Sequence, residues 1–272
     1  MEVESWIASA TKALARAGIK TARLDVLVLT ENVINKDRSW LLAHPTDEIT
    51  KFNVNKLNKL VIQRATHYPL AYITNKSYFY NNEFYVDDHV LVPRPESETI
   101  IDILKSLKLT KKHTIIDVGT GSGALAITAK LLFPKSSVMA LDIDPSCLKI
   151  AKTNSASFDA HITFLQSDLL KSLPVNSAAN SVMLVNLPYV PTDFPINDSA
   201  DFEPRTAIFG GIDGLELYTG LFGQINCLSL KPNYMITESF PSQHSALQAI
   251  AKKVGYELNA TSDYIQLFSH RR

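Results

Sequence analysis

The chain has 272 residues, of which 46% are hydrophobic and 20% are charged, a composition that excludes a disordered chain and suits one or two globular domains. Its 27 Lys and Arg residues balance its 27 Asp and Glu residues. This neutrality argues against a protein that grips long stretches of nucleic acid, which usually carries excess positive charge.

The two cysteines, Cys147 and Cys227, lack the spacing of metal ligands, so we expect small buried side chains and no metal site. The absence of a disulfide pattern fits a reducing compartment. The N-terminus is acidic and no apolar run reaches membrane-spanning length. These features predict a soluble, cytoplasmic protein without a membrane partner.

Residues 1 to 75 have the apolar spacing of helices and no strand pattern. Thr21 is a candidate N-cap for a second helix that turns Leu24 inward, and Asp37 is a candidate cap for a short helical turn. A third long helix is expected from about Asn53 to Thr66. This part predicts a small helical bundle suited to packing or to recognition of a partner.

After residue 75 the spacing of apolar residues changes from that of helices to that of strands. Residues 77–80 and 83–86 flank Asn81-Asn82, a pair able to take positive φ in a tight turn, which predicts a β-hairpin. Residues 89–92 read as another short extended run. A helix is expected to begin near Pro95, with acidic residues in its first turn.

From residue 96 onward strands and helices alternate, which predicts an α/β domain with a mostly parallel, doubly wound sheet. Strands are expected at 114–118, 137–141, 161–165, 181–185 and 234–237, helices at 123–132, 145–156, 214–228 and 242–254, and a terminal hairpin at 256–261 and 264–268. The chain therefore divides into a helical domain (1–75), a hairpin linker (76–95) and an α/β domain (96–272).

The first of these strands runs into a glycine-rich loop, in which glycines let the backbone turn sharply and approach a ligand. The spacing of the glycines is not G-x-G-x-x-G, which disfavours a dinucleotide-binding loop that holds a pyrophosphate. No Lys-Ser/Thr follows the glycines, which excludes a P-loop. A plain tight turn remains an alternative. The loop comprises Gly119, Thr120, Gly121, Ser122 and Gly123.

Carboxylates follow the next two strands. Asp142 ends the second strand, where such a residue can accept both hydroxyls of a ribose, whereas Asp144 is placed to cap the following helix. After the third strand, Asp168-Leu169 presents an acid that either reaches the exocyclic amine of an adenine or belongs to a turn.

The fourth strand ends in Asn186-Leu187-Pro188-Tyr189. The Asn186 oxygen and the backbone carbonyl near Pro188 can accept hydrogen bonds, and the Tyr189 ring offers a flat apolar face. This set suits a planar substrate with an NH₂ group, although the tetrapeptide alone is also ordinary turn chemistry.

The order of these elements resembles the class I S-adenosylmethionine (SAM)-dependent methyltransferases, whose seven-stranded Rossmann-like sheet ends in an antiparallel hairpin. Further segments resemble the HemK/PrmC family of release factor glutamine N5-methyltransferases over nearly the whole chain. They are Arg23-Leu24-Asp25, Pro69 to Ile73, the hairpin, Val92 to Glu98, Glu203-Pro204-Arg205 and Phe209 to Leu215.

The resemblance implies methylation of the glutamine side-chain amide in the Gly-Gly-Gln motif of peptide chain release factors, with SAM as cofactor. It implies that Gly119 to Gly123, Asp142, Asp168, Leu169 and Asn186 hold the cofactor. It also implies that Asn186, Leu187, Pro188 and Tyr189 hold the glutamine, with Asn186, Pro188 and Tyr189 as the catalytic set.

Two departures from the family pattern stand out. Leu187 occupies the place of a proline, and Asn-Leu-Pro-Tyr resembles the motif of ribosomal RNA adenine dimethyltransferases. Thr74-Asn75 comes after Tyr72-Ile73, where members of the family commonly continue with a glycine. Adenine-N6 methylation of RNA or DNA is therefore an alternative, as is a non-catalytic SAM-binding protein, whereas the neutral charge makes nucleic acid a poor candidate for the direct substrate.

Overall fold

The computed structural model describes residues 1–107, 109–110 and 113–271. They divide into two compact units. The helical unit comprises Met1–Lys76 together with Ile196–Phe202, and the sheet unit comprises Ser77–Pro195 and Glu203–Arg272. Every helix of the described part is too short or too polar to cross a membrane.

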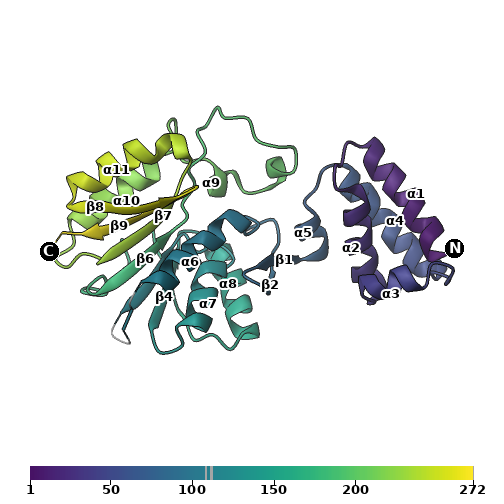
Figure 1. Ribbon diagram of the computed structural model, residues 1–272, viewed down its shortest axis with the longest axis horizontal. Coiled ribbons are helices and arrows are strands. Elements are labelled where there is room, and N and C mark those ends of the chain that lie inside the picture. The colour runs from purple at the N-terminus through teal and green to yellow at the C-terminus, as the bar shows by residue number, and fades with distance from the viewer. Residues whose placement is uncertain (108, 111–112, 272) are drawn as a thin grey trace. The chain divides into compact units, whose positions relative to one another are not determined.

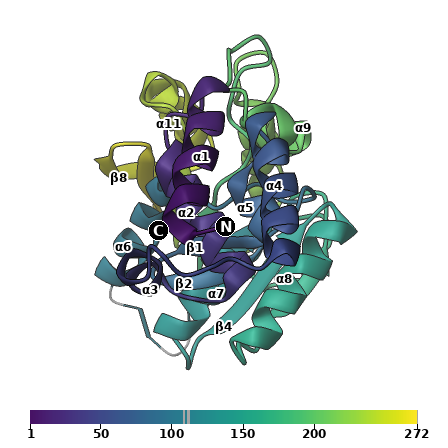
Figure 2. The same cartoon turned by 90° about the vertical axis from the view of Figure 1, so that its right-hand side faces the viewer.

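The helical unit packs its helices around an apolar core that includes Trp6, Leu29 and Leu57. Figure 2 looks onto this unit and shows α1 and α4 lying side by side. Its helices are α1 (Val3–Arg16), α2 (Ala22–Ile34), α3 (Arg38–Ala43), α4 (Lys51–Ala65) and α5 (Leu70–Thr74), with the short 3₁₀ turn η2 (Ala200–Phe202).

The start of α2 departs from expectation. Leu24 is 47% exposed, and the side chain of Thr21 makes no capping hydrogen bond. Asp25, the residue after Leu24, is buried in its place and pairs with the buried Arg64 at 2.7 Å. Asp37, by contrast, caps α3 as predicted, because its side chain accepts a hydrogen bond from the Trp40 N–H at 2.7 Å.

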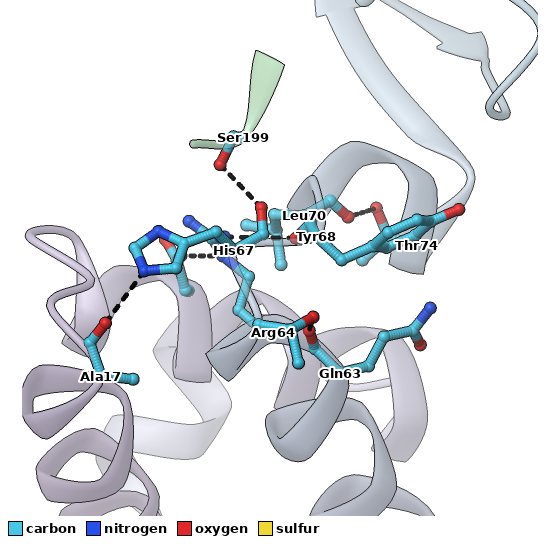
Figure 3. Close-up of polar contacts among 10 residues, drawn as sticks. Ala17, Gln63, Arg64, His67, Tyr68, Leu70, Thr74 and Ser199 are labelled. Carbon is cyan, nitrogen blue, oxygen red and sulfur yellow. Dashed lines mark hydrogen bonds and ion pairs between the residues drawn. The ribbon is translucent and has the colours of Figure 1, made fainter. Parts of the chain in front are cut away.

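Figure 3 shows how the segment 196–202 joins the helical unit. The Ser199 hydroxyl donates to the carbonyl of His67 at 2.8 Å, and the His67 ring contacts the Ala17 carbonyl through Nε2 at 3.0 Å. The rings of Tyr68 and Phe202 meet edge to face at 5.4 Å. His67 is therefore a packing residue, with φ of 69° at the end of α4.

In the described residues of the sheet unit, seven strands form one sheet in the order β5-β4-β3-β6-β7-β9-β8, with β9 antiparallel to both of its neighbours. This confirms the predicted fold class. The strands are β3 (Thr114–Val118), β4 (Ser137–Asp142), β5 (Thr163–Gln166), β6 (Ser181–Val185), β7 (Tyr234–Glu238), β8 (Tyr256–Ser262) and β9 (Ile265–His270).

Helices cover both faces of this sheet, with α6 and α7 on one side and α10 and α11 on the other (Figure 1). Side chains alternate between the two cores, since successive residues of a strand point to opposite faces. Ile115 belongs to the α6–α7 core and Ile116 to the α10–α11 core. The helical elements are η1 (Pro95–Ser97), α6 (Glu98–Ser106), α7 (Ala124–Leu132), α8 (Pro145–Ser157), α9 (Arg205–Ile208), α10 (Glu216–Asn226), η3 (Pro241–Gln243) and α11 (His244–Lys253).

The predicted hairpin is present as β1 (Lys76–Phe79) and β2 (Asn82–Tyr85). Its positive-φ residues are Tyr80 and Asn81, one position earlier than expected. Residues 89–92, however, do not form a strand. Asp87 accepts hydrogen bonds from the His89 N–H and, through its carbonyl, from the Val90 N–H, so the backbone turns there instead of extending.

Candidate active site

The polar ends of neighbouring strands meet at one edge of the sheet. Val118 of β3 lies in register with Leu141 of β4 and with Val185 of β6, so the residues that follow these three strands converge. A cavity opens there. Within the described part of the chain, its lining includes these predicted site residues: Gly119, Thr120, Gly121, Ser122, Asp142, Asp168, Leu169, Asn186, Leu187 and Pro188.

The glycine loop is anchored to the next strand. The backbone N–H groups of Gly119 and Thr120 both donate to the Leu141 carbonyl, at 2.8 and 2.9 Å. Gly121 has φ of 53°, and apart from its neighbours no described atom lies within 4 Å of the place where a Cβ would stand. The tip of the loop therefore leaves room for a ligand to approach the backbone closely.

Gly123 has a different local role from the two preceding glycines. It precedes α7 with φ of 83°, and a Cβ at this position would stand 3.1 Å from the Ala151 Cβ of α8. It is absent from the described lining of the cavity. Its lack of a side chain lets α7 pack closely against α8, and its contact with a cofactor stays a prediction.

A buried acid lies beneath the loop. Asp117 is 1% exposed and accepts hydrogen bonds from the Thr120 hydroxyl at 2.6 Å and the Ala126 N–H at 3.2 Å. Burial raises the pKa of its carboxyl to about 7. Its Oδ1 atom has no hydrogen-bond partner among the described residues, so the end of β3 retains a buried polar atom that is not satisfied.

Asp142 lines the cavity at the end of β4. Its carboxylate accepts the Gly121 N–H at 2.8 Å and the Asp144 N–H at 3.0 Å. Burial raises the pKa of this group. A carboxylate has about four acceptor positions, so it retains capacity for ligand hydroxyls and fits the predicted ribose contact. Asp144 caps α8 as predicted, accepting from the Ser146 N–H at 2.7 Å.

The turn after β5 also reaches the cavity. Leu169 has φ of 53°, and the Asp168 carboxylate is exposed and pairs with Lys171 at 2.6 Å. The turn role weighed for Asp168 is thus present in the structure. The same residue lines the cavity, so the turn and ligand roles are compatible.

Asn186 follows β6 and belongs to a buried chain of hydrogen bonds. Its Nδ2 atom donates to the Ser97 hydroxyl oxygen at 2.8 Å, and that hydroxyl donates to Glu238 at 2.6 Å. The Tyr189 hydroxyl donates to the other oxygen of Glu238 at 3.0 Å. Burial raises the pKa of the Glu238 carboxyl, since only 1% of the residue is exposed.

The other members of the tetrapeptide are held by packing. Leu187 is 5% exposed, and its Cδ2 would lie 3.0 Å from a Cβ on Gly119, so its side chain supports the glycine loop. A Cβ added at Gly210 would overlap the carbonyl oxygens of Pro188 and Gly214. The segment 209–215 can therefore lie against the Pro188 backbone only because residue 210 is a glycine.

Sequence reasoning missed several residues that support this site. Gln243 donates to the carbonyls of Tyr189 and Asp213, each at 2.8 Å, and so ties segment 209–215 to the tetrapeptide. Glu238 is the last residue of β7, the strand beside β6. Its position as an acid at a strand end could have identified it in the sequence as a candidate site residue. Cys147 is buried and lines the cavity, whereas Cys227 is exposed, contrary to expectation.

The segment before α6 is fixed by a second buried acid. Glu203 is 5% exposed and accepts the Arg94 guanidinium at 2.6 Å and the Val92 N–H at 3.1 Å. This pair links segment 92–98 to segment 203–205. It also holds Ser97, three residues after Arg94, beside Asn186.

The sheet order, the glycine loop and the acid after β4 define a class I SAM-dependent methyltransferase, and SAM is its cofactor. A solved structure with the same fold is the 16S rRNA methyltransferase RsmC of T. thermophilus in complex with AdoMet and guanosine, with a TM-score of 0.50 at 16% identity over 72% of this chain and 50% of that one. The models for the PrmC N-terminal domain and for ribosomal protein L11 methyltransferase match residues 5–74 and 97–187.

Curated relatives narrow this class. The chain is 34% identical to the release factor glutamine methyltransferase of Koribacter versatilis, over 83% of this chain and 81% of the relative. It is 32% identical to that of Moorella thermoacetica, over 94% and 91%. The chain belongs to the release factor glutamine methyltransferase family, which confirms the resemblance read from its motifs.

Proposed function

We propose that this enzyme transfers the methyl group of SAM to the side-chain amide nitrogen, N5, of the glutamine in the Gly-Gly-Gln motif of peptide chain release factors. Family membership supports the choice of substrate. The observation that carries the proposal is the Asn186 amide, whose nitrogen is engaged by Ser97 beside the cavity. Its oxygen remains as the end that can accept a substrate N–H.

SAM supplies an electrophilic methyl group when it is bound. The loop backbone at Gly121 would approach the cofactor, and Asp142 would accept its ribose hydroxyls, as the open space and the spare acceptor positions allow. The full proposed cofactor set is Gly119, Thr120, Gly121, Ser122, Gly123, Asp142, Asp168, Leu169 and Asn186.

The chain's own residues would act chiefly by orientation. An amide nitrogen is a poor nucleophile because its lone pair is delocalised into the carbonyl. In the proposed complex the Asn186 oxygen and the Pro188 carbonyl accept its two N–H groups. The Tyr189 ring is absent from the described lining of the cavity and meets the Phe240 ring at 5.1 Å, so its packing against the amide plane stays a prediction. Such positioning can contribute about 7–11 kcal/mol to lowering a barrier, so a strong base is not required.

Methylation of an adenine amine is the competing activity, and Leu187 was the residue that favoured it. That side chain is buried against the glycine loop, which accounts for it without a nucleobase. Incubation with labelled SAM and either a release factor or ribosomal RNA separates the two. We expect label on the release factor at the Gly-Gly-Gln glutamine; label on RNA alone would overturn the proposal.

The division of labour is part of the same proposal. Residues 1–75 would recognise the release factor, 76–95 would form the linker, and 96–272 would carry out the transfer. A protein substrate from translation termination would place the enzyme in the cytoplasm. A chain that lacks both pieces of the helical unit, with 1–75 deleted and 196–202 replaced by a short flexible linker, should then still bind SAM while losing affinity for the release factor, which calorimetry with each ligand would measure.

A further inference from the structure

We propose that Ser97 and Glu238 are positioning residues that determine which end of the Asn186 side-chain amide faces the substrate. This inference rests on the proposed function, because it assigns the Asn186 oxygen to the methyl-accepting NH₂ group. Ser97 lines the cavity beside Asn186, whereas Glu238 is absent from the described lining. Their effect passes through Asn186.

An asparagine amide has two ends of nearly equal size and opposite polarity, a carbonyl acceptor and an NH₂ donor. Only the acceptor end can bind a substrate amide NH₂ group. With the amide turned by 180°, two NH₂ groups would face each other and the hydrogen bond would be lost. A site that uses Asn186 as an acceptor therefore needs a partner that fixes its orientation.

The hydrogen-bond chain supplies this partner with a defined direction. A carboxylate only accepts, and each oxygen of Glu238 meets one hydroxyl, that of Ser97 at 2.6 Å and that of Tyr189 at 3.0 Å. The single hydroxyl proton of Ser97 is used on Glu238. Its oxygen is then left as an acceptor, and it meets the Asn186 Nδ2 atom at 2.8 Å. The two acceptor oxygens of Glu238 thus turn the nitrogen end of Asn186 toward the interior.

The surroundings keep this order in place. Ser97 is 3% exposed and Glu238 is 1% exposed, so water does not compete for either group. Ser97 lies at the junction of η1 and α6, Glu238 is the last residue of β7, and Asn186 follows β6. Three separate elements therefore have to be folded before the amide is oriented.

Glu238→Gln is the sharpest test, because it keeps the size of the side chain and replaces one acceptor oxygen with a donor NH₂ group. A glutamine that donates to Ser97 frees the serine proton to meet the Asn186 oxygen, which favours the reversed amide. We expect kcat with a release factor to fall by roughly 100-fold, comparable to loss of one preorganised polar group, with SAM affinity and thermal stability close to wild type.

Serine variants test the middle of the chain. Ser97→Thr keeps the hydroxyl and should retain most of kcat, whereas Ser97→Ala should lose it. The double variant Ser97→Ala/Glu238→Gln should be no worse than either single variant, since both break one relay. Glu257→Gln is the matched control, because Glu257 lies on β8 of the same sheet and pairs with Arg271 at the surface.

A readout independent of turnover separates this inference from the proposed function. In labelled wild-type protein, the Asn186 side-chain NH₂ protons should show nuclear Overhauser contacts to the Ser97 Hβ protons, and Glu238→Gln should remove them. If wild-type protein methylates no release factor, the proposed function fails while these contacts still decide the orientation. Unchanged contacts in Glu238→Gln, or a Ser97→Ala enzyme with wild-type kcat, would overturn the inference.

Discussion

The backbone N–H of Gly121 donates to the Asp142 carboxylate at 2.8 Å, so the acid that ends β4 also holds the tip of the loop that follows β3. Asp142 thus shapes the loop, and its proposed second task is to accept ligand hydroxyls. Removing it should disturb both.

Asp142→Ala should therefore weaken SAM binding by roughly 10- to 100-fold, the effect of losing hydrogen bonds to a charged acceptor. Calorimetry with SAM measures this directly. Asp144→Ala is a matched control, because that carboxylate caps α8, so it should lower stability with a smaller effect on affinity. Wild-type affinity in Asp142→Ala would remove Asp142 from the proposed cofactor set.

Asn186→Ala should abolish methyl transfer while leaving most of the SAM affinity, because the substrate nitrogen loses its proposed acceptor. We expect kcat to fall by roughly 100-fold or more. Single-turnover transfer of label to a release factor is the measurement, with SAM affinity measured in parallel. Near-normal turnover would show that Asn186 does not orient the glutamine.

Gly210→Ala should lower both stability and kcat. The added methyl group overlaps the Pro188 and Gly214 carbonyls, and forcing it in costs about 1–3 kcal/mol. Gly223→Ala should instead raise stability. This exposed glycine lies inside α10, and apart from its chain neighbours and the backbone of its own helix no described atom lies within 4 Å of an added Cβ. We expect that variant to gain about 0.5–1 kcal/mol, with unchanged kcat. Equal unfolding free energies for the two variants would contradict the packing argument.

Asp117 should make stability depend on pH. Burial raises the pKa of its carboxyl to about 7 in the folded state, so between about pH 4 and pH 7 the folded protein binds more protons than the unfolded chain. Stability contributed by this group is therefore lost as pH rises through that range, at no more than about 1.4 kcal/mol per pH unit.

Asp117→Asn removes this titration and keeps an acceptor for Thr120 and the Ala126 N–H. Denaturant unfolding of both proteins at pH 5, 6 and 7 should show the variant gaining on wild type as pH rises. Asp142 also has a raised pKa, and its charge contributes to raising that of Asp117, so the difference between the two proteins reports Asp117 together with this interaction. Parallel pH curves would mean that Asp117 does not titrate in this range.

Much of this site was readable from the sequence because it depends on strand ends. The glycine loop, Asp142 and Asn186 lie at the carboxyl ends of β3, β4 and β6, which are neighbours in the sheet, and parallel register brings such residues together. The same reasoning correctly placed Asp144 and Asp37 as helix caps. These features are local, so short stretches of sequence carry their signal.

The errors arose where a distant residue decides. Asp25, and not Leu24, faces the interior at the start of α2, where it pairs with Arg64, 39 positions away. The turn at 87–90 is local, but Val92 is held by Glu203, 111 positions away. Ser97 and Glu238 are 141 positions apart and meet only in the folded sheet unit. Side-chain pairings at such separations leave no periodic signal in the sequence.

The helical unit is built from two separate pieces of chain, since Ile196–Phe202 belongs with Met1–Lys76. A fragment cut at residue 76 would lack the Ser199 hydroxyl that His67 accepts and the Phe202 ring that packs on Tyr68. The complementary fragment would carry those groups with no partners. Swapping the helical unit between relatives therefore calls for exchanging both pieces together, with the second graft placed between Pro195 and Glu203.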